Sequence, residues 1–486
     1  MKKSVLHMKR TLAVSGFLFA LLAFFALTGT AIAEEVQPQQ TLFTNVNIFN
    51  GTDDKLYENH HVLVEGNLIK SISAEPIAVN RSAKTKVIDG KGRTLMPGLI
   101  NSHTHLNMYG LTFSYAGLQS AQWSQIGAQA AANARDQLMD GFTTIRDTCG
   151  MDDGLQKLID RGTVVGPRIY TAGACISPTS GHGEARAPNQ RKPGTPPSYI
   201  EELGLVELTD SPDEMRAASR RNFSNGAHFL KLMAGGGISS TIDPLWSIAY
   251  TPAEIEAAVE AASYFDTYVM VHAYTDRTVK MALDAGVKVI DHGQMVTEDT
   301  VKRMAKEGVY WVTNLGALYP DLLAHPNFGV EPVKSKLESF FKGSEQLVSY
   351  IKKYKPKHVF GVDVVLSPTA LARNTRDFEK HLFAEWFGNY AMLVAATSTP
   401  GEMAQLTGRR NPYPAAKLGV IEVGAYADIL IVDGNPLEDI SVIGANEKWF
   451  DAGPREEGHE TIRVIMKDGK IYKNSQDEVG TEKEID

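Results

Sequence analysis

Short apolar segments alternate with amphipathic helical segments through the middle of this chain, from about residue 94 to residue 407. Each apolar segment has the length and β-branched content of a buried strand. Such alternation is typical of repeated βα units, whose strands run parallel because each helix crosses back over the sheet. We predict strands at residues 95–103, 142–147, 168–172, 229–233, 268–272, 287–292, 309–313 and 358–363. Eight such units predict an α/β fold, a (β/α)8 TIM barrel.

Both ends of the chain after residue 33 have the alternation of β-hairpins instead. Residues 41–74 contain strand patterns separated by turn residues, and a similar pattern returns at residues 426–432, 462–466 and 471–472. We expect residues 34–93 and 408–474 to pair into one small β-sandwich domain that brackets the barrel of residues 94–407. Residues 475–486 are polar and acidic and predict a solvated tail.

The N-terminus has the pattern of a targeting segment. Basic residues at positions 2, 3, 9 and 10 precede an apolar run from residue 12 to 27, and Ala31-Ile32-Ala33 offers small residues to a signal peptidase. We therefore predict a signal peptide at residues 1–33, a periplasmic or secreted bacterial protein, and no stable membrane insertion after cleavage. An uncleaved anchor is the alternative, because the apolar run is long.

Net charge and cysteine content limit the partners and the sources of stability. Residues 1–33 contain four basic and no acidic side chains, so cleavage changes the formal net charge from −8 to −12. This acidic balance excludes nucleic acid as a partner, because phosphate binding needs a basic face. The two cysteines, Cys149 and Cys175, both follow predicted strands. In an oxidising compartment they would form a disulfide if those strands are neighbours, or remain two buried thiols.

Polar side chains occur where several predicted strands end or, in one case, within an apolar strand. They are His103 and His105 on the first strand, Lys231 within the fourth, His272 on the fifth, His292 on the sixth and Asp363 on the eighth. Alone, each would more often be a core histidine, a salt-bridged lysine or an ion-pair partner. The carboxyl ends of barrel strands converge on one site, however, and imidazole and carboxylate are common metal ligands. Together these residues predict a metal centre.

Several segments resemble known family motifs. Residues 97–105 resemble the first-strand motif of the amidohydrolase superfamily, and residues 418–428 resemble its closing signature. Within that superfamily the chain is most similar to the prolidase-like branch, which contains Xaa-Pro dipeptidases and imidazolonepropionase-related enzymes. The segments that carry this similarity are residues 229–237, 271–274, 290–293 and 361–363.

The resemblance implies two divalent metal ions, which we expect to be Zn²⁺. His103 and His105 would hold one ion, His272 and His292 would hold the other, and Asp363 would ligate the first ion. Lys231 would bridge both ions, which a bare ammonium group cannot do because it has no acceptor lone pair. The resemblance therefore implies that Lys231 is N-carboxylated.

The resemblance also implies a hydrolase that cleaves a carbon–nitrogen bond in a small molecule, a dipeptide or an N-acyl amino acid. A metal-bridging hydroxide would attack the carbonyl carbon, and Asp363 would carry the proton to the leaving nitrogen. His182 and Tyr274 are predicted to contact substrate, although a surface loop histidine and a packed barrel tyrosine are the simpler alternatives. Candidates for binding a free carboxylate are Arg186, Arg191, Lys192 and Arg277.

Two other functions fit the same motifs. One is a cyclic-amide hydrolase of the imidazolonepropionase type, against which Lys231 and the predicted export both argue. The other is a catalytically silent binding protein with the same fold, against which the complete set of ligand residues argues. For any of these functions we expect a homo-oligomer.

Overall fold

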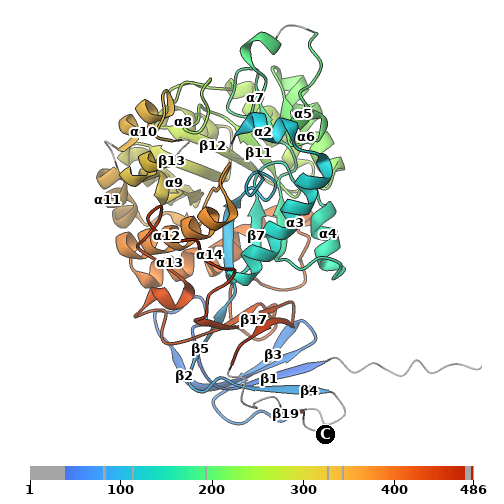
Figure 1. Ribbon diagram of the computed structural model, residues 1–486, viewed down its shortest axis with the longest axis vertical. Helices are drawn as coiled ribbons and strands as arrows, with labels where there is room; N and C mark the ends of the chain where they lie inside the picture. The colour runs from blue at the N-terminus through green and yellow to red at the C-terminus, as the bar shows by residue number, and fades with distance from the viewer. Residues whose placement is uncertain are drawn as a thin grey trace, which may run out of the picture.

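The protein has a larger part of helices and parallel strands and a smaller part built from both ends of the chain (Figure 1). This computed structural model describes residues 39–79, 84–111, 114–191, 194–325, 328–341, 344–476 and 483–484. The predicted signal peptide, residues 1–33, and most of the predicted acidic tail lie outside the described residues. Within the described part of the chain, no helix combines the length and the apolarity that crossing a bilayer requires.

Short parallel strands lie at the centre of the larger part, and each of the eight predicted strands overlaps one of them. They are β6 (Leu99–Thr104), β7 (Phe142–Asp147), β8 (Arg168–Thr171), β11 (Leu230–Met233), β12 (Val269–Thr275), β13 (Val289–Met295), β14 (Tyr310–Val312) and β15 (Lys357–Val359). Almost all their side chains are buried. Burial on both faces explains why these strands are continuously apolar in the sequence.

The strands pair in two parallel sheets, with the orders β6-β7-β8 and β10-β9-β11-β12-β13-β14-β15. The sequence pattern did not predict β9 (Cys175–Ser177) and β10 (Val206–Leu208). Backbone hydrogen bonds join the two sheets at their seams. Ser102 donates to the Phe360 carbonyl at 3.1 Å, and the His103 carbonyl accepts from Val362 and Asp363 at 3.2 and 2.9 Å, while His228 donates to the Thr171 carbonyl at 2.8 Å. The predicted barrel is therefore confirmed in its strands and in their parallel direction. The strand pairing is not continuous around the ring, however, and forms two sheets.

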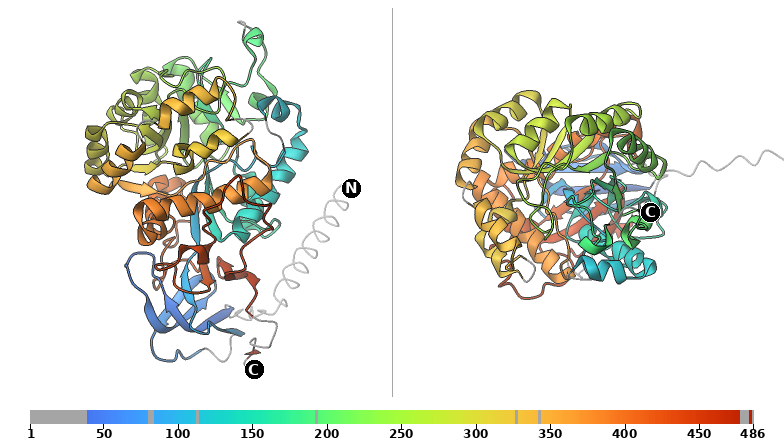
Figure 2. Two further views of the ribbon diagram at one scale, coloured as in Figure 1. Left: turned by 60° about the vertical axis from the view of Figure 1, so that its left-hand side comes forward. Right: turned by 90° about the horizontal axis from the view of Figure 1, so that it is seen from above.

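Helices surround these strands, as the view from above shows (Figure 2, right). They are α2 (Tyr115–Ser120), α3 (Trp123–Met139), α4 (Gly154–Asp160), α5 (Tyr199–Glu202), α6 (Pro212–Ser224), α7 (Pro252–Ser263), α8 (Asp276–Asp284), α9 (Glu298–Glu307), α10 (Val333–Phe340), α11 (Ser344–Tyr354), α12 (Thr369–Phe387), α13 (Asn389–Ala395) and α14 (Ser398–Ala404). Helix α7 begins with a capping box in which the Glu254 carboxylate accepts the Thr251 backbone N–H at 2.8 Å. With helices over the outer face, the polar side chains at the carboxyl ends of the strands are expected to converge on one site.

The smaller part is one nine-stranded sheet, in which the blue N-terminal strands lie beside the red C-terminal ones (Figure 1). Its strands are β1 (Gln40–Ile48), β2 (Tyr57–Glu65), β3 (Leu68–Ser73), β4 (Thr85–Asp89), β5 (Thr94–Pro97), β16 (Ile429–Val432), β17 (Ile462–Lys467), β18 (Lys470–Asn474) and β19 (Lys483–Glu484). The predicted pairing of both chain ends is confirmed. The strands of the predicted β-sandwich form one continuous sheet that curls over its own core, where Leu68 of β3 bridges to Tyr426 beside β16.

The first predicted barrel strand is divided between the two parts. Thr94–Pro97 forms β5 and pairs with β1 and β16, whereas Leu99–Thr104 forms β6 and pairs with β7. Gly98 lies at the change of sheet, where a Cβ atom would come within 2.0 Å of the Thr143 hydroxyl oxygen. Glycine therefore allows β6 to approach β7 closely as the chain enters the larger part.

Candidate metal centre

Five strand ends deliver the predicted ligand residues to one cavity of about 120 Å³. The residues that line it include His103, His105, Lys231, His272, His292 and Asp363. His103 lies in β6, and His105 is the first residue after it, while the others lie in or just after β11, β12, β13 and β15. The structure therefore brings together all six predicted residues, although they come from distant parts of the sequence.

Three of these side chains form a tight triangle. His103 Nε2 lies 3.1 Å from His105 Nε2, and the Asp363 Oδ1 atom lies 3.2 Å from the first and 3.1 Å from the second. Ligand atoms at about 2.0–2.1 Å from a tetrahedral Zn²⁺ ion are roughly 3.3 Å apart. The triangle thus has almost the spacing that one such ion requires.

Electrostatics in the triangle agree with a site for a cation. Although burial opposes its charge, contacts with His103 and His105 hold the pKa of Asp363 well below its usual range. Burial lowers the pKa of His105, which favours the neutral imidazole that binds metals. Among the described residues, the buried Nδ1 atom of His292 has no hydrogen-bond partner, and it lies 3.9 Å from Asp363 Oδ2. A buried nitrogen without a partner is costly, so its lone pair fits binding to a cation.

His272 and His292 lie side by side next to the triangle. Their ring centroids are 4.5 Å apart, and the His292 ring lies 5.3 Å from that of His103. The ligand atoms of His103, His292 and Asp363 all lie within 4.8 Å of one another. Burial holds the pKa values of His272 and His292 well below the ordinary histidine value. Both rings are therefore neutral and can bind a metal ion through a ring nitrogen. Together with the triangle, they offer more ligand atoms than one tetrahedral ion needs from the protein.

Lys231 is buried in β11 and lines the same cavity as the histidines. Its Nζ atom lies 3.7 Å from Asp291 Oδ2, and burial lowers its pKa, which increases the share of neutral amine. Asp291 is held by Arg146 at 2.9 Å and contacts His103 Nδ1 at 2.6 Å. A carboxylate on the second ring nitrogen fixes the orientation of a metal-binding histidine. Sequence analysis did not identify Asp291 as part of the site, although it directly precedes His292.

The two residues predicted to contact substrate line the same cavity. His182 stacks on His272 with centroids 4.4 Å apart, and its Nδ1 atom lies 3.1 Å from Asp243. Tyr274 stacks on His292 at 4.7 Å. Because His182 lies in the long loop after β9, its position could not be deduced from strand periodicity.

Of the basic residues predicted to bind a carboxylate, the three that the structure describes, Arg186, Arg191 and Arg277, do not line this cavity. Arg186 lies 2.6 Å from Glu184, and Arg191 lies 3.4 Å from the same carboxylate. Arg277 is exposed on α8, and Lys192 lies outside the described residues. The two arginines therefore order the loop through Glu184, which binds both.

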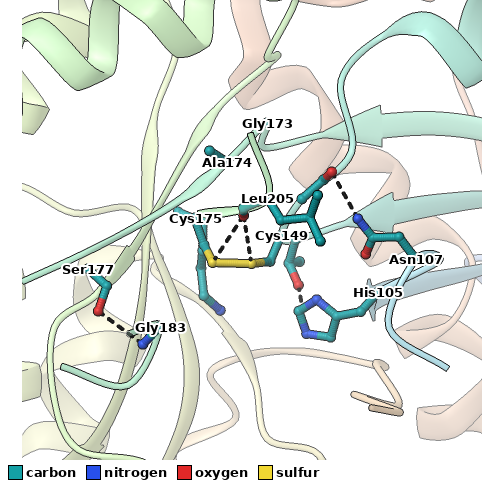
Figure 3. Close-up of a disulfide and its surroundings, with 12 residues drawn as sticks. His105, Asn107, Cys149, Gly173, Ala174, Cys175, Ser177, Gly183 and Leu205 are labelled. Atoms are coloured by element: carbon teal, nitrogen blue, oxygen red, sulfur yellow. Dashed lines mark hydrogen bonds between the residues drawn. A yellow bond between two sulfur atoms is a disulfide. The ribbon is translucent and has the colours of Figure 1, made fainter. Parts of the chain in front are cut away.

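A disulfide forms part of the cavity wall. Cys149 and Cys175 are bonded, and their Cα atoms lie 4.8 Å apart. Figure 3 shows the disulfide near His105, whose Nε2 atom lies 3.5 Å from the hydroxyl oxygen of Thr148, the residue before Cys149. Of the two states expected from the sequence, the structure contains the disulfide, which links the chain after β7 to β9.

A further wall comes mainly from segments that sequence analysis did not connect with the site. It contains Glu379 of α12, Gly316 of the 3-10 helix η2 (Leu315–Leu318), and Trp449 and Phe450 from the segment before β17. Gly316 lies three positions after the predicted strand at residues 309–313, but the other residues are far from the predicted strand ends, and no local pattern marks them. Only the packing of the C-terminal segment against α12 reveals them.

Comparisons with known proteins agree with this architecture. Residues 94–336, half of the chain, match the amidohydrolase family. An ochratoxinase from Aspergillus niger is 25% identical over 429 residues, covering 87% of this chain and 84% of the relative.

Two solved structures have the same fold. A prolidase in complex with N-methylphosphonate-L-proline is 29% identical with a TM-score of 0.76, and the match covers 90% of this chain and 100% of that one. A Xaa-Pro dipeptidase with bound methionine is 27% identical with a TM-score of 0.72 and the same coverage. Similarity to these proteins extends over both parts of the chain.

Proposed function

The chain belongs to the amidohydrolase family, as its motifs predicted, and we propose that it hydrolyses the amide bond of dipeptides or N-acyl amino acids. The family match and the prolidase, dipeptidase and ochratoxinase relatives support hydrolysis of a carbon–nitrogen bond in a small molecule. The observation that carries the proposal is the convergence of four histidines, one lysine and one aspartate in a single cavity.

Two divalent metal ions, with Zn²⁺ the expected species, are part of this proposal. His103, His105 and Asp363 would hold one, and His272 and His292 the other, with N-carboxylated Lys231 between them. When bound, such ions lower the pKa of a coordinated water and polarise a carbonyl group. The burial of Lys231 supports carboxylation, because only the neutral amine reacts with carbon dioxide.

Asp363 is the proton carrier in this proposal. Its Oδ1 atom faces His103 and His105, while Oδ2 lies 3.9 Å from His292, so the carboxylate is directed into the cavity from β15. It would accept the proton of the attacking water and donate it to the leaving nitrogen. Amide cleavage needs this step because an amide anion is a very poor leaving group.

His182 and Tyr274 would contact the half of the substrate that leaves as a free amino acid. Both side chains lie against the ring pair of His272 and His292, on the wall formed by β9 and β12. The ligand in the prolidase structure is an N-substituted L-proline, so it contains an amino acid like the half that would leave from the proposed substrates. Export through the predicted signal peptide and assembly as a homo-oligomer remain predictions.

The test combines metal analysis with product analysis. The metal-loaded mature chain is expected to hold two ions and to release a free amino acid from members of a dipeptide and N-acyl amino acid library. Lys231→Ala is expected to lose metal and activity, with Lys280→Ala on the exposed face of α8 as control. A wild-type protein that releases no amino acid would contradict the proposal, and full metal occupancy in Lys231→Ala would contradict the bridging role.

A further inference from the structure

Glu379 is a buried carboxyl group in the wall of the metal-centre cavity, with an exposed fraction of 2%. Its two oxygens accept the backbone N–H groups of Leu315 and Gly316, the latter at 2.7 Å. Among the described residues, no lysine, arginine or histidine pairs with it. Glu379 thus differs from the buried aspartates nearby on α3 and α12, each of which contacts an arginine.

A buried carboxylate without a cation is expensive to keep charged. Burial, reinforced by the charge of Asp363, raises the pKa of Glu379 to about 8. The two backbone donors compensate only part of the lost hydration. A cationic group inside the cavity would be the missing partner, and it would hold Glu379 in its charged form.

Glu379 borders the cavity beside aromatic side chains. A Cβ atom on Gly316 would lie 3.0 Å from Glu379 Oε2 and 3.3 Å from Trp449 Cη2, so glycine keeps the carboxyl group and the indole edge adjacent. The Trp449 N–H group already donates to the Thr375 hydroxyl at 2.9 Å, and its ring stacks with Phe378 and Phe450. The wall beside Glu379 is therefore apolar, which strengthens any charge pair formed there.

The position of Glu379 relates it to one half of the substrate. Gly316 and Glu379 follow β14 and β15, whereas His182 follows β9, and β11, β12 and β13 separate these two sides of the sheet. If His182 and Tyr274 contact the leaving amino acid, Glu379 faces the acyl half. A dipeptide has an α-ammonium group in that half, whereas an N-acyl amino acid has none.

We propose that Glu379 forms a subsite for a primary ammonium group on the acyl half of the substrate, so that dipeptides with a free amino terminus are preferred over N-acyl amino acids. This inference rests on the amide hydrolysis proposed above and chooses between its two substrate classes. A charge-assisted hydrogen bond in an apolar wall is strong enough to discriminate between these two substrate classes, and it favours the one with the ammonium group.

The test uses alanyl-proline and N-propionyl-proline, which differ only in the α-ammonium group. We expect the metal-loaded wild-type chain to have a kcat/KM at least about 10-fold higher for alanyl-proline, the lower end for a hydrogen bond to a charged group. Glu379→Gln is expected to lower kcat/KM for alanyl-proline about 10- to 100-fold. It should leave the value for N-propionyl-proline within about threefold, because that substrate makes no charge pair.

Glu385→Gln is the matched control, because Glu385 lies on the same helix with 56% of its side chain exposed. It should retain the preference for alanyl-proline. Equal losses on both substrates in Glu379→Gln would overturn the proposal, since they would show that Glu379 only supports η2. Equal wild-type activity on the two substrates would also overturn it, and that comparison requires no folded variant.

Failure of the proposed function has a different signature. If neither compound is cleaved, calorimetric titration of the same two compounds into the same protein still measures the subsite. Tighter binding of alanyl-proline that is lost in Glu379→Gln would support the subsite while amide hydrolysis fails. Equal binding of both compounds would overturn the subsite.

Discussion

Two buried clusters in this protein meet the same geometric condition, that ligand atoms of three histidine or aspartate side chains lie within 4.8 Å of one another. One is the histidine site, defined as His103, His105, Lys231, His272, His292 and Asp363. The other is the arginine cluster, defined as Asp136, Asp140, Arg376, Asp377, Lys380, Arg455 and His459. Their comparison shows that proximity of ligand atoms does not by itself make a metal site.

The arginine cluster is internally neutralised. Arg376 contacts Asp136 and Asp140 at 2.6 Å each, and Arg455 contacts Asp140 at 2.8 Å. These cations hold the pKa of Asp140 far below its usual range, although burial opposes the charge. The cluster joins α3, α12 and the segment before β17, so it fastens the C-terminal segment to the larger part. A metal ion would have to displace an arginine.

The histidine site has the opposite charge pattern. Burial makes His105, His272 and His292 neutral, and Asp363 is a carboxylate without an arginine partner among the described residues. The ligands point at a cavity instead of at each other's counter-ions. The two clusters therefore differ mainly in whether arginines neutralise their carboxylates, and less in the spacing of their ligand atoms.

The largest expected effect follows from Asp363→Asn in the histidine site. Because the amide cannot carry the proton, kcat/KM should fall by about 10²–10⁴-fold while the folded structure is retained. The measurement is hydrolysis of a library substrate together with circular dichroism. Asp377→Asn is the matched change in the arginine cluster, and it should leave the metal content per folded chain unchanged. Retained turnover in Asp363→Asn would remove this residue as proton carrier.

Arg376→Met should have the largest effect on stability. It leaves the buried charges of Asp136 and Asp140 with one partner fewer, so the free energy of unfolding should fall by about 3–5 kcal/mol. Chemical denaturation measures this change, and metal analysis of the folded fraction should still give the wild-type content. A loss of metal at unchanged stability would contradict the distinction between the two clusters.

Asp291→Asn should have an intermediate effect. The neutral amide would no longer fix the charge and orientation of His103, so metal affinity should fall about 10- to 100-fold. Competition with a chelator measures it. Asp284→Asn on α8, whose side chain is 70% exposed, is the control and should bind metal normally. Unchanged affinity in Asp291→Asn would mean that β6 alone orients His103.

His459→Gln in the arginine cluster should have the smallest effect. His459 lies 3.1 Å from Asp377, and burial lowers its pKa, so it adds a polar contact by a neutral ring and no compensating charge. The free energy of unfolding should change by about 1 kcal/mol, and metal content should not change. If His459→Gln reduced bound metal by one ion, the arginine cluster would be a second metal site after all.

Local patterns in the sequence predicted the strands well because burial on both faces makes a parallel strand continuously apolar. The positions of His103, His105, His272, His292 and Asp363 followed from those strands, since side chains at their carboxyl ends share one site. Lys231 was identified because a lysine inside an apolar strand is conspicuous. Their roles in binding metal remain predictions, while their convergence is observed.

Features that depend on contacts between distant segments could not be predicted in the same way. The sequence did not decide whether Cys149 and Cys175 form a disulfide or remain two thiols. It also did not identify Glu379 or Trp449 as part of the cavity wall. It also suggested carboxylate-binding arginines that the fold pairs with Glu184 instead.

By itself, the sequence determined the type of fold and the donor atoms of the site, because periodicity and residue chemistry are local properties. Only the tertiary structure decided which charges are compensated. Asp140 is buried and Asp363 is partly buried, but Asp140 contacts arginines from two other segments, whereas Asp363 faces histidines in a cavity. Whether a buried charge is compensated depends on side chains that come from distant parts of the chain. This difference in compensation distinguishes the histidine site from the arginine cluster.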